Sequence, residues 1–242
     1  MRIRAVAALA IVLASAACGG TSLFRQYEYE EEVYLSLDRT ATVYVNSSIA
    51  ALNALRGTSF NTSPTARVNR EAVRALYASP VTRVVWVRDS RRNGRRFVHL
   101  RIEADDVTKL SAVAPFAWSA YEFRLDGDEY VYRQTLGPPA APRGLFAGWT
   151  GRELVAFRLH LPSKIISKNT GPERRGNILV WEQPLADRLR AAPLTLDARM
   201  QTQSILYRTL WLFAATFVAV IVGFVAVIWW VFRRGATHAE TV

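Results

Sequence analysis

Arginines that can bind an anion gather around one turn. A nine-residue stretch contains Arg88, Arg91, Arg92, Arg95 and Arg96, and it is interrupted by Asn93-Gly94. Asn-Gly between two apolar runs favours a tight β-hairpin, so the arginines are expected at its tip. Guanidinium groups pair with phosphate and carboxylate groups. We therefore predict a site for anionic headgroups here; the alternative is a solvated surface in an arginine-rich chain.

A second candidate is apolar. The loop 137–151 is rich in Pro and Gly, yet it contains Leu145, Phe146 and Trp149. Apolar side chains in such a loop can enter a membrane interface or contact a ligand. The alternative is that they pack against the sheet.

Two acidic clusters contain residue types that could bind a cation. Glu28, Glu30, Glu31 and Glu32 fall in a predicted strand, where neighbouring side chains point to opposite faces. We expect a solvated edge, with pairing to the excess arginines as the alternative. Residues 126–129 carry three carboxylates, but their spacing lacks the regular oxygen ladder of a calcium loop. A tight turn accounts for them better.

Enzyme signatures are absent from the sequence. The chain has no HExxH, GxSxG or GxxxxGK[ST] motif. His99 and His160 fall in predicted strands, where a surface or structural role is expected. The lone cysteine excludes an internal disulfide and a CxxC framework. We therefore expect a protein that is not an enzyme, with no catalytic residue, no cofactor and no metal.

The amino-terminal residues 1–17 have the pattern of a signal peptide. Arg2 and Arg4 precede a short apolar run, which is followed by small residues. Cys18 comes next and resembles the acylated cysteine of a bacterial lipoprotein, so we predict lipidation at Cys18. Ordinary signal-peptidase cleavage that leaves a free thiol is the alternative.

The carboxy-terminal part predicts a membrane span. Residues 210–232 contain no charge and would rise about 35 Å as a helix, enough to cross a hydrocarbon layer of ~30 Å. The arginine pair after it indicates that the tail 233–242 is cytoplasmic. Residues 202–209 are a predicted juxtamembrane linker. The expected interface anchors are Arg208, Trp211, Trp229, Trp230, Arg233 and Arg234.

The middle region, residues 18–201, predicts an extracytoplasmic α+β domain. Alternating apolar residues and turn dipeptides indicate one mainly antiparallel sheet of about eight strands with a few short helices. Ser47 or Ser48, and then Asn69, can cap two helices. The continuous apolar run Val84–Val87 indicates a central strand. The whole fold class is α+β with a single C-terminal transmembrane helix.

A local resemblance joins these features. The segments Phe157–Pro162, Asn169–Gly171 and Gly176–Trp181 resemble a strand, a Leu-Pro turn, an Asn-Gly turn and a Trp-bearing strand of LppM-like lipoproteins of bacterial envelopes. The resemblance implies an extracytoplasmic domain that handles lipids or glycolipids without an established enzyme activity. It assigns no ligand residues in this chain.

Charge and location together indicate the partners. The chain carries a formal charge of +11, but export would remove it from nucleic acid, so no nucleic-acid partner is expected. We predict a single-pass protein of the bacterial cell membrane whose domain lies outside the cytoplasm. We expect it to bind a lipid or amphiphile. The alternative is an interaction or scaffold subunit of an envelope protein complex.

Overall fold

The structure of the protein is a computed structural model that describes residues 25–140, 148–170 and 174–237. The predicted signal peptide 1–17, Cys18, Leu145 and Phe146 lie outside the described residues. What is described is an α+β fold followed by one long helix, which confirms the predicted fold class.

The strands form two sheets where the sequence predicted one. The larger sheet has the order β3-β4-β2-β1-β7-β10-β9, and the smaller has the order β5-β6-β11-β8. The larger sheet contains β1 (Tyr27–Leu35), β2 (Ala41–Ser48), β3 (Thr82–Arg92), β4 (Arg95–Ala104), β7 (Leu154–His160), β9 (Arg174–Arg175) and β10 (Ile178–Pro184). The smaller contains β5 (Ser119–Asp126), β6 (Glu129–Leu136), β8 (Ser163–Lys168) and β11 (Leu194–Ser204).

Short helices flank the sheets, and the caps of two of them follow from the sequence. Ser48 accepts a hydrogen bond from the Ala51 N–H and begins α2 (Ile49–Arg56), and Gly57 ends it in the left-handed conformation. Asn69 caps α3 (Arg70–Tyr77) in the same way. The remaining short helices are η1 (Val107–Ala112), η2 (Ala114–Phe116) and α4 (Leu185–Leu189).

The position of β3 corrects the sequence prediction, because β3 is an edge strand and not a central one. A register shift lies between Val84 and Trp86, so the apolar run does not simply alternate between the two faces. Val84 and Val87 are buried, and α3 contacts the strand through the Arg74 guanidinium, which donates to the Val84 carbonyl. The apolar run in β3 is therefore explained by the bulge and by the contact with α3. It does not require a neighbouring strand on both sides.

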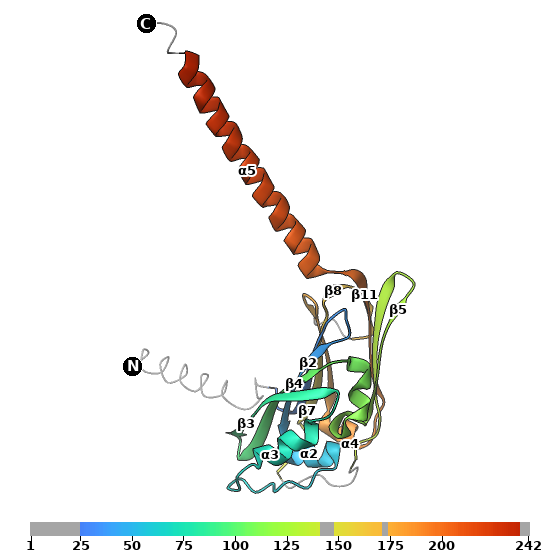
Figure 1. The fold of residues 1–242 in the computed structure, drawn as a ribbon. Helices are drawn as coiled ribbons and strands as arrows, with labels where there is room; N and C mark the ends of the chain where they lie inside the picture. The colour runs from blue at the N-terminus through green and yellow to red at the C-terminus, as the bar shows by residue number, and fades with distance from the viewer. Residues whose placement is uncertain (1–24, 141–147, 171–173, 238–242) are drawn as a thin grey trace, which may run out of the picture.

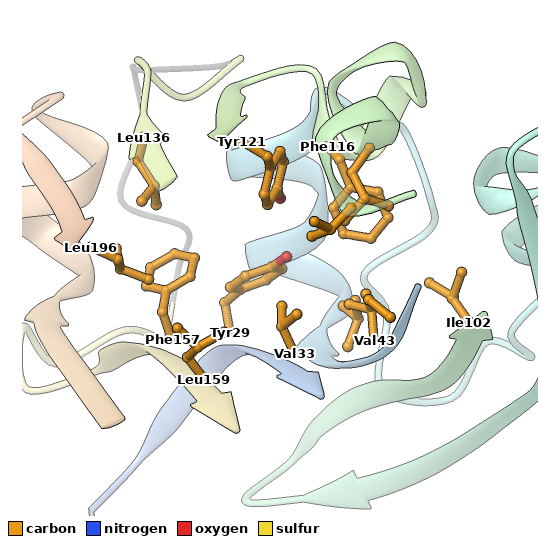
Figure 2. Close-up of a cluster of buried hydrophobic side chains, with 14 of the residues drawn as sticks. Tyr29, Val33, Val43, Ile102, Phe116, Tyr121, Leu136, Phe157, Leu159 and Leu196 are labelled. Atoms are coloured by element: carbon orange, nitrogen blue, oxygen red, sulfur yellow. The ribbon is translucent and has the colours of Figure 1, made fainter. Parts of the chain in front are cut away.

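The core lies between the two sheets. Tyr29, Phe157 and Leu159 of the larger sheet point toward Tyr121 and Leu196 of the smaller one (Figure 2). These side chains are at most 5 % exposed, so the sheets pack face to face through interlocking aromatic and aliphatic groups.

One carboxylate, that of Glu31, lies inside this apolar core. It is 1 % exposed, and it accepts hydrogen bonds from the Tyr121 hydroxyl and the Gln134 amide of the smaller sheet, each at 2.9 Å. The Tyr29 hydroxyl donates at 2.9 Å, and Arg56 of α2 pairs at 3.3 Å. Burial raises the pKa of Tyr29 and Tyr121 well above that of free tyrosine, which keeps both as hydrogen-bond donors. Glu31 thus ties both sheets and α2 together.

Strand register gives the domain two distinct ends. At one end of the larger sheet, Leu35 pairs with Ala41, which pairs with Ala104. Helix α5 starts near this end, where the Ile205 N–H donates to the Pro162 carbonyl at 3.0 Å. We call it the α5 end. The β3–β4 turn at Asn93 lies beyond the other end, which we call the hairpin end. The nine residues of β1 separate the two ends by about 30 Å, and α2, α3 and α4 gather opposite the start of α5 (Figure 1).

The final helix, α5 (Ile205–Thr237), extends away from the domain (Figure 1). Within Ile205–Arg233, an apolar window of 18 residues has a mean hydropathy of 2.6, and none of this window is buried. The helix is therefore long and apolar enough to cross a membrane. β11 continues to Ser204, so strand and helix meet inside residues 202–209.

We predict that Glu31→Gln destabilises the protein by about 3–5 kcal/mol, because the substitution leaves the Arg56 charge buried without its counterion. Denaturant unfolding of the full chain in uncharged detergent measures this. Glu122→Gln, on the exposed face of β5, is the matched control and should change stability by no more than about 0.5 kcal/mol. Equal effects of the two substitutions would contradict the role assigned to Glu31.

Candidate functional site

The β3–β4 hairpin brings the five predicted arginines together, but two of them serve the fold. Arg91 lies opposite Arg96, and Arg92 lies opposite Arg95. Arg95 pairs with the buried carboxylates of Glu28 and Glu153 at 3.4 and 3.5 Å. Arg96 is buried, and its guanidinium donates to the Ala66 carbonyl. These contacts hold the hairpin against the loop before α3 and against the segment before β7.

The other arginines of the hairpin keep more of their charge available. Arg88 lies over the Trp86 ring at 4.8 Å. Arg92 donates to the Tyr27 carbonyl at 2.5 Å and lies over the Phe97 ring. The Arg91 side chain is exposed and makes no ion pair or hydrogen bond with the described residues.

A groove of about 410 Å³ lies between this hairpin and the loop before α3. We call it the basic groove; its lining residues are Ala66, Arg67, Val68, Arg70, Asp89, Arg91 and Arg96. Arg70 is neutralised by Asp89, with an Nη2–Oδ1 distance of 2.6 Å. Arg67 is exposed and, like Arg91, has no partner among the described residues. The basic groove is thus lined by the unpaired guanidinium groups of Arg67 and Arg91 and by the buried Arg96.

Arg67 and Arg70 were not predicted as site residues. They precede or begin α3, at least eighteen residues before the predicted arginine cluster that starts at Arg88, and only the α3–β3 packing brings them to Arg91. The only hint in the sequence was that these two arginines lie on either side of the predicted helix cap at Asn69.

A smaller hollow of about 150 Å³ lies beside Arg92 and contains His99. The His99 Nδ1 lies 2.8 Å from the Asn46 Oδ1, and its Nε2 lies 2.8 Å from the Ser90 hydroxyl. Burial, and then the positive charge of Arg92, lower the pKa of His99. His99 is thus a hydrogen-bonded neutral imidazole at near-neutral pH.

The acidic cluster in β1 is paired with arginine and histidine side chains and does not form a solvated edge. β1 is flanked by β2 and by β7, which corrects the predicted edge position. Glu30 pairs with Arg158, and Glu32 with His160 at 2.5 Å. The His160 hydrogen bond is the main cause that lowers the pKa of Glu32. The predicted alternative, pairing with the excess arginines, holds for Glu30, and Glu32 pairs with a histidine instead.

The acidic turn and the apolar loop also have structural contacts. Arg199 pairs with Asp126 at 3.0 Å and with Glu129 at 3.4 Å, so these carboxylates are occupied by a cation of the chain. Trp149 is partly buried against the core, and its indole N–H donates to Glu28 at 3.3 Å. For Trp149 this matches the packed alternative. Within the described ranges, no three His, Cys, Asp or Glu side chains converge as metal ligands would.

The predicted interface anchors lie along α5. Trp211, Trp229 and Trp230 are 61, 60 and 50 % exposed. The Arg233 guanidinium lies 5.0 Å from the Trp229 ring centroid. The side chains of Arg208 and Arg234 lie outside the described part of the structure. The described anchors, Trp211, Trp229, Trp230 and Arg233, are therefore exposed on the helix surface, where a membrane could contact them.

Comparison with known proteins gives one distant structural likeness. No protein-family model and no curated protein sequence matches the chain. The NMR structure of the folded domain of Mycobacterium tuberculosis LppM aligns with a TM-score of 0.41 and 13 % sequence identity. The alignment covers 76 % of this chain and 95 % of that one. That protein carries the name of the family that residues 157–181 resemble.

We predict that protonation of His99 destabilises the protein. Its folded pKa lies below the unfolded value of about 6.5, so the unfolded state binds the proton first as pH falls. The free energy of unfolding should therefore be highest above about pH 7 and should decrease toward pH 5.5. Denaturant unfolding at pH 7.5 and 5.5 measures this; His99→Gln should reduce the difference. A difference that His99→Gln leaves unchanged would contradict this assignment.

Proposed function

We propose that the protein is a non-enzymatic, membrane-anchored module whose β-rich domain lies outside the cytoplasm and binds the anionic headgroup of a lipid or amphiphile. The observation that carries the proposal is the convergence of Arg67 and Arg91, without partners, in the basic groove. A phosphate or carboxylate headgroup fits two guanidinium groups that hold no counterion of their own.

The character of α5 supports the membrane anchor. The helix is uncharged from residue 210 to residue 232, has tryptophans toward both ends of that stretch and buries none of its apolar window against the domain. In water such a surface would be unfavourable, at about 25 cal/mol per Å² of apolar area, and a bilayer removes that cost. The Arg pair after residue 232 favours a cytoplasmic tail.

The contents of the core favour recognition of a headgroup over enclosure of an acyl chain. Buried side chains such as Tyr29, Phe157 and Leu196 lie between the sheets (Figure 2). The basic groove is instead a surface feature with room for a small polar group. Its lining contains no Ser, Cys or His, and its one carboxylate is paired with Arg70. This composition is suited to binding and not to nucleophilic chemistry.

The position of the groove limits which headgroups it can reach. It lies at the hairpin end, about 30 Å along β1 from the α5 end. A domain that stands upright on its helix would hold the groove away from the adjacent leaflet. The groove then serves an amphiphile in transit or an apposed surface.

A second candidate function is docking of an envelope protein. The edge strands β5 and β8 carry Leu125 and Ile166, which are 55 and 47 % exposed. Apolar side chains on unpaired sheet edges are suited to pairing with another chain. These exposed edges are the observation that favours an interaction subunit.

The double substitution Arg67→Ser/Arg91→Ser tests the headgroup proposal. Each basic residue near an anionic surface is worth about 1 kcal/mol, so the pair should reduce affinity roughly tenfold to thirtyfold. The full chain, in uncharged detergent, is titrated with nanodiscs of phosphatidylglycerol mixed with phosphatidylcholine, with pure phosphatidylcholine discs as the lipid control.

Arg83→Ser/Arg124→Ser is the matched variant, because it removes the same charge from exposed residues outside the groove. We expect it to retain most of the affinity. Equal losses in the two double variants would show that only net charge matters and would overturn the groove as the site.

A further inference from the structure

Two buried arginines lie against one indole ring inside the domain. Arg56 ends α2 and Arg188 lies in α4, so they come from segments far apart in sequence. Their guanidinium carbons lie 3.5 and 5.5 Å from the Trp118 ring centroid. The Arg56 side chain is 1 % exposed, and Arg188 is fully buried.

Most hydrogen-bonding capacity of these two groups has no partner. Arg56 uses Nη2 for Tyr29 and Glu31, and Arg188 uses Nη2 for the Gly137 carbonyl at 2.9 Å. The Nε and Nη1 atoms of both arginines have no hydrogen-bond acceptor. The Trp118 indole nitrogen is also buried without an acceptor. Buried donors are nearly always satisfied in folded proteins, so this set needs an explanation.

The charges do not balance either. Glu31 compensates Arg56, and its oxygens are already engaged by Tyr29, Tyr121 and Gln134. No carboxylate among the described residues pairs with Arg188. Burial, and then the positive charge of Arg56, lower the pKa of Arg188. Water could satisfy the free N–H groups, but it would not compensate the second positive charge.

We propose that Arg56, Arg188 and the indole N–H of Trp118 form an internal binding site for one oxyanion, the carboxylate or phosphate group of a small ion or of an amphiphile. The site presents donors, and an oxyanion is an acceptor with a compensating charge. It is separate from the basic groove, whose lining contains neither Arg56 nor Arg188.

Thermal unfolding of the full chain in uncharged detergent tests this site. The probes are sodium phosphate, as the free ion, and monododecyl phosphate, as the amphiphile, at ionic strength held constant with NaCl. A ligand that binds only the folded state should raise Tm by roughly 5–10 °C at a hundredfold excess over its Kd. Stabilisation by phosphate identifies a free ion, and stabilisation by monododecyl phosphate alone identifies an amphiphile.

Arg188→Met removes the charge and keeps a side chain of similar length. We expect it to abolish the shift and, without probe, to leave Tm equal to or above the wild-type value, since an uncompensated buried charge is removed. A purely structural arginine would give a lower Tm. Arg190→Met, which alters an exposed neighbour, should retain the shift.

Two further variants keep the test decisive. Trp118→Phe keeps an aromatic ring and removes the indole N–H, so it should weaken binding of the probe several-fold, which tests the site independently of Arg188→Met. Arg67→Ser/Arg91→Ser should leave the shift intact, which separates this site from the proposed groove. Absence of a shift with either probe, or a shift that persists in Arg188→Met, would overturn the proposal.

Discussion

The buried carboxylate of Glu31 is the interaction on which the arrangement of the domain depends. A charge removed from water inside an apolar core is unfavourable unless hydrogen bonds and a counterion replace the water. Glu31 receives these from four elements: Tyr29 of its own strand, Arg56 of α2, Tyr121 of β5 and Gln134 of β6. Apolar contact alone would allow the sheets to slide past each other. The directional bonds fix one register between them.

The same strand also shows how the arginine excess is used. Carboxylates of β1 and of the segment before β7 bind Arg56, Arg95 and Arg158, so a large part of the positive charge is structural. Among the arginines without an ion pair, Arg67 and Arg91 converge in the basic groove, and Arg188 is buried with two unpaired nitrogens. Net charge is therefore a poor guide to function in this chain. The guanidinium groups left without partners are the better guide, because their donors and charge can still be engaged by a ligand.

Sequence patterns were informative where structure is local. Helix caps at Ser48 and Asn69, and the hairpins at Asn93-Gly94 and Asp126-Gly127, depend on a few adjacent residues and agree with the structure. Non-local features were not predictable. The split into two sheets, the edge position of β3 and the burial of Glu31 depend on which distant strands pair. Arg67, Arg56 and Arg188 became site residues only because packing brings them to Arg91 or to Trp118.

We propose that the basic groove, which lies at the end of the domain opposite the start of α5, is outside the cytoplasm. Labelling of single cysteines with a membrane-impermeant maleimide tests this most directly. Arg91→Cys and Thr241→Cys are compared in a Cys18→Ser background in intact spheroplasts and after lysis. We expect position 91 to react in both samples and position 241 to react only after lysis. Labelling of position 241 in intact spheroplasts, with position 91 protected, would contradict the account.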